Sequence, residues 1–526
     1  MKELYQICKY NNIGIIKNIL AYISNFVLKK KFKTFFIFVS LCFYYYRNMF
    51  NKRNLIDLLL KLPKLGKYIK NEMEKNTKMI QDDINNGGNY QNVFPEHSHT
   101  ITEVYQKINK YKHTHDDDKI SGIIYYNDTE YNKDLLKLYS DYCQQNPLHP
   151  NVFPQIRQME IETINIMSKL YGGGSDCCGN ITYGGTESIL LACYTYREWG
   201  KMKKGIVKPN IVAPESIHPA FDKACYYFGI KLQKIPLNSD YSVNPQDLNK
   251  YINSNTIMVA ASAPNYAHGI VDPIRIIGEL CYNHNVGFHV DCCMGGFIVP
   301  FINSEETNQV NFYTKGITSI SMDSHKYGYC HKGSSILLMK NIALKKFQHY
   351  INTGWNGGIY CTPTLMGSKS GGLISTVWGA LHLNGRKKYT QYAEEIIENL
   401  NLIKNEFENN TLIEIIGNPL LNIIAFKSNK LNIYHVIDEM KKKNWDLSVL
   451  QNPPGFHFCI TKCQDKKIIE QFISDLKSSI TIAKNNPSKL SGTLSLYGSS
   501  QSVENSLFTD DLVNNFVTLL SREKIY

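Results

Sequence analysis

Lys326 is the first residue in this sequence whose surroundings suggest chemistry. It lies in the turn Ser321–Tyr329 (SMDSHKYGY), at the end of the short apolar run 319–322. A lysine at such a place is partly removed from water, which favours the neutral amine that can attack a carbonyl group and form an imine. A single lysine is far more often a solvated surface residue. The neighbouring motifs must therefore decide what Lys326 does.

A carboxylate ends another apolar run, 35 residues before this lysine. Asp291 follows Gly287–Val290 (GFHV). A carboxylate there can hold a protonated pyridine nitrogen, and this ion pair makes a pyridine ring an electron sink. A lone aspartate at the end of a strand is more often a helix cap or a structural hydrogen-bonding group. Asp291 on its own thus carries little weight.

A glycine turn, Tyr183–Ser188 (YGGTES), precedes a helical pattern. Its two glycines let the backbone approach an anion closely, and the helix N-terminus behind them offers free N–H groups and a positive dipole. Thr186 adds a hydroxyl group, although an ordinary N-cap loop would look the same. An anion cradle, a strand-end carboxylate and a strand-end lysine, in this order, are typical of a pyridoxal phosphate (PLP) enzyme of fold type I.

The elements that position these motifs alternate along the chain. Apolar runs predict strands at 210–213, 256–261, 287–290, 319–322 and 335–339, and helical patterns lie between them at 187–199, 220–228 and 273–284. This alternation predicts an α/β domain with a mostly parallel sheet and helices on both faces. Ligands bind at the carboxyl ends of such strands, where the motifs fall. His218 follows the first run, where its flat ring could stack on a cofactor or form a hydrogen bond within its own loop.

The charge distribution separates the first 80 residues from the rest. The net charge is +12; residues 1–80 hold 16 basic and 4 acidic residues, and the remainder holds 42 of each. A basic segment around the uncharged run 34–46 (TFFIFVSLCFYYY) indicates a membrane surface and not nucleic acid. Helical, this run spans about 20 Å, so we expect a single anchor whose flanking lysines reach the interface, with an interfacial or a buried helix as alternatives.

The cysteines indicate a reducing cellular compartment and show no pattern of a metal site. The 14 cysteines include no CxxC pair and no Cys/His spacing of a zinc site. We therefore expect reduced thiols in a protein that faces the cytosol, and no metal cofactor.

From about Leu55 to about Val503 the sequence resembles the sphingosine-1-phosphate lyases, PLP enzymes of the group II decarboxylase-like type. The segments that carry the resemblance are SGIIYY (121–126), NPLHPNVFPQIRQME (146–160), GGTESILLAC (184–193), HVDCCMGGF (289–297), SISMDSHKYGYCHKGSS (319–335), WNGGIYCTPTLMGSKSGG (355–372), PPGFHFCIT (453–461) and LYG (496–498). They are collinear with the family over most of the chain.

The resemblance implies a role for each candidate site residue. The cofactor residues would be Lys326, which forms the imine, Asp291, which pairs with the pyridine nitrogen, Gly185, Thr186 and His325, which hold the phosphate, and His218, which stacks on the ring. The residues at the substrate phosphate and the reaction centre would be Tyr125, His149 and Lys332, joined by Tyr360 from a partner subunit. A homodimer with shared active sites is therefore implied.

The resemblance also implies an architecture. It predicts an aspartate aminotransferase-like large domain with a mostly parallel sheet (146–380) and a smaller α+β C-terminal domain (381–526). These would follow a membrane-anchor region (1–54) and an N-terminal arm (55–145). The family relation and the reduced cysteines together predict a single-pass protein of the endoplasmic reticulum membrane with its catalytic domain facing the cytosol.

The implied activity is retro-aldol cleavage of the C2–C3 bond of a phosphorylated sphingoid base, giving a long-chain aldehyde and phosphoethanolamine. A PLP-dependent amino-acid decarboxylase is the first alternative, and a membrane-tethered scaffold without activity is the second. Three departures from the family pattern stand near the site: Cys292 in place of alanine, Tyr183 in place of serine, and His331 beside Lys332. We expect Cys292 to lie against the cofactor ring and to alter its tilt.

Overall fold

The computed structural model describes residues 94–110 and 116–485, together with the isolated helical positions 67, 71, 78, 513, 514, 517 and 518. The chain divides into two units, Met1–His115 with Asn486–Tyr526, and Asp116–Asn485. In the first unit, α6 (Ile101–Asn109) begins with a capping box between Thr100 and Glu103. The predicted anchor at 34–46 lies outside the described residues. Across the described part, no helix combines the length and the apolar character needed to cross a membrane.

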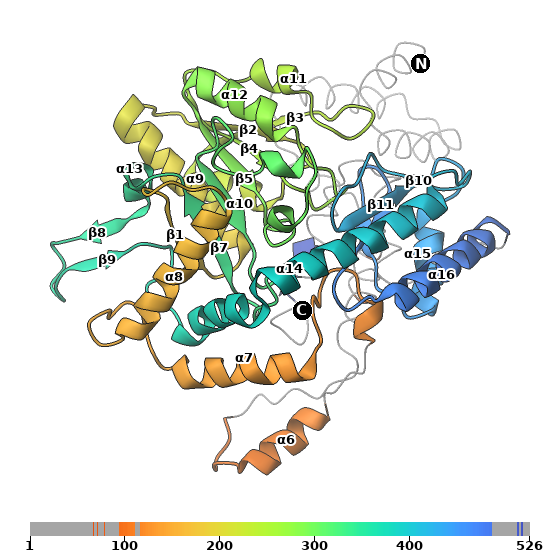
Figure 1. Cartoon of the computed structure of the whole chain (residues 1–526), viewed down its shortest axis with the longest axis horizontal. Helices are drawn as coiled ribbons and strands as arrows, with labels where there is room; N and C mark the ends of the chain where they lie inside the picture. The colour runs from red at the N-terminus through yellow and green to blue at the C-terminus, as the bar shows by residue number, and fades with distance from the viewer. Residues whose placement is uncertain are drawn as a thin grey trace. The chain divides into compact units, whose positions relative to one another are not determined.

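A seven-stranded sheet forms the centre of the second unit (Figure 1). Its strands are β1 (Cys178–Thr182), β2 (Asn210–Pro214), β3 (Lys231–Ile235), β4 (Thr256–Ser262), β5 (Gly287–Asp291), β6 (Ser319–Met322) and β7 (Ser335–Met339). Their order is β1-β7-β6-β5-β4-β2-β3. The pairings from β3 to β6 are parallel, whereas β7 runs antiparallel to both of its neighbours. The predicted strands and the mostly parallel sheet are confirmed.

Helices cover this sheet because its central strands are buried along their whole length. The helices of this part are α7 (Thr129–Tyr142), α8 (Pro154–Leu170), α9 (Gly185–Lys204), α10 (Ala220–Phe228), α11 (Pro245–Asn249), α12 (Ile274–His284) and α13 (Ile342–Lys345). One core cluster joins α9 and α10 to the sheet, with Phe221, Ile211 and Met258 fully buried in it. The three predicted helices are confirmed as α9, α10 and α12.

A second sheet lies beyond the long helix α14 (Gly371–Phe407), which bends at Gly385. Its strands are β10 (Glu414–Ile415), β11 (Ile423–Lys427), β12 (Ser448–Leu450) and β13 (Gly455–Cys459), antiparallel in the order β10-β11-β13-β12. Two helices, α15 (Ile433–Lys442) and α16 (Lys466–Asn485), pack on it. The predicted domain boundary at residue 380 falls within α14, a few residues before Gly385, where non-helical backbone angles separate the two parts of this helix.

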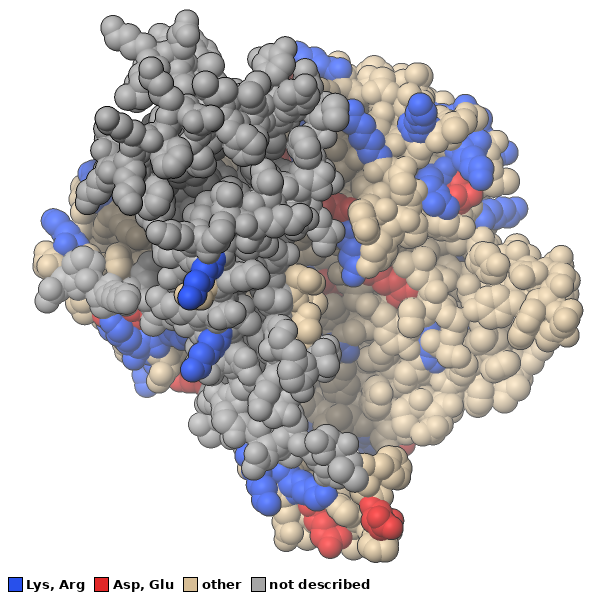
Figure 2. Space-filling model, turned by 180° about the vertical axis from the view of Figure 1, so that it is seen from behind, with Lys and Arg blue, Asp and Glu red and all other residues tan. Residues whose placement is uncertain are grey.

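A two-stranded hairpin, β8 (Tyr350–Asn352) and β9 (Tyr360–Thr362), extends from the large sheet region (Figure 1). It carries large apolar side chains that are exposed to solvent, among them Ile351 and Ile359. Seen from behind, in Figure 2, the projecting right-hand part of the molecule and the surface below it show few charged side chains, whereas the upper part of the same side carries several Lys and Arg side chains. Apolar exposure of this kind is typical of a surface that another molecule covers.

Candidate active site

The turn between β6 and β7 brings the predicted lysine into a buried ion pair. The Nζ atom of Lys326 lies 3.0 Å from Oδ2 of Asp323, and both side chains are mostly buried. Burial lowers the pKa of Lys326, but the charge and the hydrogen bond of Asp323, together with the neighbouring Tyr125 and Cys293, outweigh it and hold this pKa above its ordinary value. In the same way the pKa of Asp323 stays below its ordinary value despite burial.

Tyrosines from α14 hold this turn in place. Tyr329 has a positive φ of 58°, a conformation that a bulky side chain rarely adopts. Its ring stacks on Tyr389 at 6.0 Å between centroids, and the Tyr389 hydroxyl donates to the carbonyl of Gly328 at 3.0 Å. These contacts fix the backbone two residues beyond Lys326, so the lysine is presented on a rigid support.

The glycine turn lies beside the lysine turn. Gly184, with a φ of 86°, precedes α9, and no side chain caps this helix N-terminus. A Cβ atom on Gly185 would lie 2.6 Å from Oδ1 of Asp323, and one on Gly184 would lie 3.5 Å from Cε1 of His325. The glycines therefore keep open a space between the helix N-terminus and His325, and Thr186 stands exposed at its edge. Such a space suits a phosphate group.

Asp291 ends β5 at the same edge of the sheet and is buried. Its Oδ1 atom accepts from the N–H of Cys293 at 3.1 Å and from the hydroxyl of Ser321 at 3.4 Å. His218, at the end of β2, lies close by: burial lowers the pKa of His218, and the charge of Asp291 opposes this shift. Its Nδ1 atom accepts from the N–H of Ala220 at 3.1 Å, which orients the ring.

The expectation for Cys292 is wrong. Its thiol points away from the site and donates to the carbonyl of Ala263 at 3.2 Å. The thiol of Cys293 instead points into the site, 3.5 Å from the hydroxyl of Ser321. A Cβ atom on Gly185 would approach this sulfur to 2.9 Å. The reason is the alternation of side chains along extended backbone, which puts Cys292 on the face opposite to Asp291.

Two of the predicted substrate residues, Tyr125 and Lys332, contact each other near the turn that carries Lys326. The loop before α7 carries Tyr125, which is buried and whose carbonyl accepts from the N–H of Lys462 at 3.1 Å. The ammonium of Lys332 lies 4.5 Å from the centre of the Tyr125 ring and donates to the carbonyl of Ile123 at 2.6 Å. Burial, helped by the charge of Lys326, lowers the pKa of Lys332 to about 8. Burial raises the pKa of Tyr125 well above its ordinary value, so its phenol stays protonated.

Sequence reasoning missed Tyr266, which follows β4 at the same edge of the sheet. Its ring stands edge-on to His218 at 6.3 Å and to His457 of β13 at 4.7 Å between centroids. The rule that ligands gather at the carboxyl ends of parallel strands would have found Tyr266 if it had been applied to β4 as well. Asp323 was missed because a carboxylate three residues before a lysine carries no specific signal.

The remaining two candidates lie apart from these residues. His149 is exposed in the loop before α8, and Tyr360 lies on β9 among the exposed side chains of the hairpin. No hydrogen bond, ion pair or ring contact within the described residues joins either of them to Lys326 or Tyr125. Between residues 94 and 485, excluding 111–115, no group of three or more His, Cys, Asp or Glu side chains could hold a metal ion.

Residues 90–429 match the family model described as the pyridoxal-dependent decarboxylase conserved domain. Sphingosine-1-phosphate lyase 1 of Rattus norvegicus is 37% identical over 464 residues, which cover 86% of this chain and 81% of the relative. The chain belongs to the sphingosine-1-phosphate lyase family. The lyase of Saccharomyces cerevisiae is 34% identical over 491 residues, covering 89% of this chain and 82% of that protein. The solved structure of the Burkholderia pseudomallei lyase matches with a TM-score of 0.73 at 29% identity, over 80% of this chain and 99% of that one.

The family is PLP-dependent, and the residues of this chain fit that cofactor. The backbone at Gly185 packs against Asp323 too closely for a Cβ atom, and beside it Gly184 faces His325 at a helix N-terminus that no side chain caps. The hydrogen bonds from Cys293 and Ser321 to the carboxylate of Asp291 both go to Oδ1, and the charges of Asp291 and Lys326 both act on the pKa of His218. The predicted cofactor is thus confirmed, and this lyase family member carries the groups that PLP requires.

Proposed function

We propose that this protein is a PLP-dependent lyase that cleaves the C2–C3 bond of phosphorylated sphingoid bases and releases a long-chain aldehyde and phosphoethanolamine. The observation that carries the proposal is the position of a second cation, Lys332, beside the buried Lys326–Asp323 pair and Tyr125. A phosphate dianion needs cationic and hydroxyl donors of this kind. The family relationship supports the same substrate class.

The cofactor supplies an electron sink when it is bound. Lys326 would hold it, the free N–H groups at the start of α9 together with His325 would hold its phosphate, and Asp291 would hold its ring nitrogen. His218 would cover one face of the ring. These roles are supported by the family relationship, by the burial of Asp291 and by the position of Gly184 beside His325.

The proton of the substrate's 3-hydroxyl group needs an acceptor near the reacting bond. Nζ of Lys326, once freed by the substrate amine, is the simplest choice, because Asp323 raises its affinity for a proton. Tyr125 suits a different role: its phenol remains protonated, so it donates a hydrogen bond and does not take up the proton. His149 is proposed as a further substrate residue on the strength of the family relationship.

An amino-acid decarboxylase remains the competing function. The solved structure of a Lactobacillus brevis glutamate decarboxylase matches with a TM-score of 0.66 but at 18% identity, a level that shows the shared fold alone. PLP enzymes that act on α-amino acids often clamp the carboxylate with an arginine of the small domain. No arginine occurs between Arg386 and Arg522. This composition favours the lyase.

Product analysis separates the two functions. The purified protein is incubated with a phosphorylated sphingoid base, its unphosphorylated form, glutamate and an aromatic amino acid, and the products are identified by mass spectrometry. We expect aldehyde and phosphoethanolamine from the phosphorylated base only. Release of carbon dioxide without aldehyde would establish the decarboxylase, and no reaction with any substrate would favour the scaffold.

We also propose a homodimer in which the hairpin β8–β9 reaches the active site of a second copy. Its support is the exposed apolar surface of the hairpin, including Trp355 and Tyr360, and the separation of Tyr360 from Lys326 within one chain. Mixing equal amounts of Lys326→Ala and Tyr360→Ala subunits tests this. After random reassortment the mixture should regain about a quarter of wild-type activity, since half of the dimers are mixed and each mixed dimer holds one intact site of two. No recovery would contradict shared sites.

The N-terminal region 1–54 is proposed to anchor the protein in the endoplasmic reticulum membrane, with the catalytic unit on the cytosolic side. The support is the basic, apolar pattern of the sequence. Alkaline carbonate extraction of cell membranes should leave the full chain in the pellet. Protease added to intact microsomes should digest the catalytic unit, and protection of that unit would contradict the orientation.

A further inference from the structure

A ladder of polar side chains lies buried between β5 and β6. His289 and Asp291 are two residues apart and so point to the same face of β5. In the strand register His289 is paired with Ser319, and Asp291 with Ser321. Side chains of this kind are unfavourable in the centre of a sheet unless each finds a hydrogen-bond partner. All four are buried, and His289, Ser319 and Ser321 are completely inaccessible.

The four groups form one continuous chain of hydrogen bonds. The hydroxyl of Ser319 lies 2.8 Å from Nδ1 of His289, and Nε2 of His289 lies 3.1 Å from the hydroxyl of Ser321. The hydroxyl of Ser321 in turn donates to Oδ1 of Asp291 at 3.4 Å. The imidazole thus bridges the two serines along the strand.

The carboxylate fixes the direction of every donor in this chain. A carboxylate only accepts, so the single hydroxyl hydrogen of Ser321 is directed toward Asp291. Ser321 must then accept from Nε2–H of His289, which leaves Nδ1 to accept from Ser319. Burial lowers the pKa of His289 to about 4, so the ring is neutral and carries one N–H, as this order requires.

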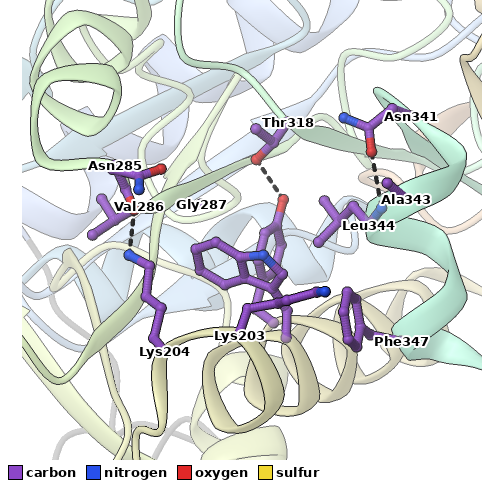
Figure 3. Close-up of a pocket in the computed structure, with 12 residues that line it drawn as sticks. Lys203, Lys204, Asn285, Val286, Gly287, Thr318, Asn341, Ala343, Leu344 and Phe347 are labelled. Carbon is purple, nitrogen blue, oxygen red and sulfur yellow. Dashed lines mark hydrogen bonds between the residues drawn. The ribbon is translucent and has the colours of Figure 1, made fainter.

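The chain of hydrogen bonds continues to the end of the strands opposite to Asp291. The hydroxyl of Tyr196, on α9, lies 2.7 Å from Ser319 and 2.6 Å from Oγ1 of Thr318. The dashed line at Thr318 in Figure 3 marks the second of these bonds, within a surface hollow that Lys203 and Phe347 also line. From Ser319 to Asp291 the donors all point toward the carboxylate, whereas the hydroxyl of Thr318 donates to the carbonyl of Phe288 at 3.0 Å. Tyr196 thus extends the hydrogen-bond chain to the far side of the sheet.

We propose that His289 is a positioning residue for the cofactor, acting through Ser321 on Asp291. This chain of hydrogen bonds directs the Ser321 hydroxyl to Oδ1 of Asp291, which also accepts from the N–H of Cys293. With Oδ1 held in this way, Oδ2 of Asp291 would be left to pair with the ring nitrogen of PLP. Aligned donors polarise one another and strengthen the last hydrogen bond to the charged group. This inference rests on the PLP cofactor of the proposed function, but not on the identity of the substrate.

The test compares PLP affinity and the absorbance of bound PLP in full-length variants. Ser321→Ala removes the donor to Asp291, and His289→Phe removes the N–H that directs the Ser321 hydroxyl toward it. For each variant we expect the apparent dissociation constant for PLP to rise about tenfold, as for one hydrogen bond to a charged group. We also expect the balance between the near-ultraviolet and visible bands of bound PLP to change, because this balance depends on the protonated ring nitrogen. His289→Gln keeps an N–H donor directed toward Ser321 and should restore both properties.

Ser479→Ala is the matched control, since it removes a buried hydroxyl group from α16, far along the chain from Asp291. It should leave the affinity and the spectrum unchanged. Wild-type affinity and spectrum in Ser321→Ala and His289→Phe would overturn the inference, as would equal losses in Ser479→Ala. If His289→Phe fails to fold, Ser321→Ala decides alone. Failure of wild type to bind PLP would instead refute the proposed function itself.

Discussion

The buried ion pair of Lys326 and Asp323 makes a quantitative prediction about the cofactor-free protein. Their charged atoms are 3.0 Å apart, with most of both side chains removed from water. The substitutions are Asp323→Asn, Lys326→Met and the two combined. Each single change leaves one buried group without its partner, whereas the double change removes both charges.

The magnitude follows from the distance. Two unit charges 3.0 Å apart attract by about 5 kcal/mol at an effective dielectric constant of about 20. Desolvation opposes part of this attraction, and removing one partner of a buried pair typically lowers the free energy of unfolding by about 3–5 kcal/mol. We therefore expect a coupling free energy of about 3 kcal/mol between the two substitutions, with the double variant more stable than the sum of the single effects allows.

The assay is urea unfolding of the cofactor-free protein at neutral pH, followed by fluorescence. The matched control is the exposed pair of Lys250 and Asp247, which are 2.5 Å apart on the surface. Its coupling should stay below about 1 kcal/mol, because solvent screens exposed pairs. Additive effects of the Asp323 and Lys326 substitutions, within about 0.5 kcal/mol, would refute the reasoning.

Three further predictions concern the same site. As the pH rises through the pKa of about 8, Lys332 loses its charge, so kcat/KM for the phosphorylated substrate should fall above this pH. The Lys332→Arg variant stays charged and should not show this fall. If the fall persists in that variant, another group causes it. Gly185→Ala should weaken PLP binding at least tenfold in equilibrium dialysis, because its Cβ meets Asp323. The control Gly174→Ala, whose Cβ meets nothing within 4 Å, should bind PLP like wild type. Equal affinities of the two variants would contradict a phosphate site at the glycine turn. Tyr266→Ala should weaken PLP binding up to about tenfold through loss of the ring contact with His218, and Tyr266→Phe, which keeps the ring, should bind like wild type.

Much of the fold was predictable because its strands are short, buried and apolar, and alternate with helical patterns. That alternation correctly placed Lys326 and Asp291 at one edge of the sheet. The antiparallel course of β7 and its position between β1 and β6 were not predictable, since strand order depends on contacts between distant segments.

The site was predictable only in part. Motifs with a defined chemistry, such as the glycine turn before α9, were found from residue types alone. Asp323 and the pair His289 and Ser321 were missed because their meaning comes from distances across neighbouring strands. The error about Cys292 was avoidable: counting the alternation from Asp291 selects Cys293 as the thiol that faces the site.

The central claim is that Lys326 is the lysine that binds PLP. Borohydride reduction of the PLP-loaded protein, followed by digestion and mass spectrometry, tests it most directly, since reduction converts the imine into a stable secondary amine on the lysine that holds it. We predict the added pyridoxyl phosphate mass on the peptide that contains Lys326, and its loss in Lys326→Ala. Labelling of Lys332 or of any other lysine in the wild-type protein, with Lys326 unmodified, would contradict the account.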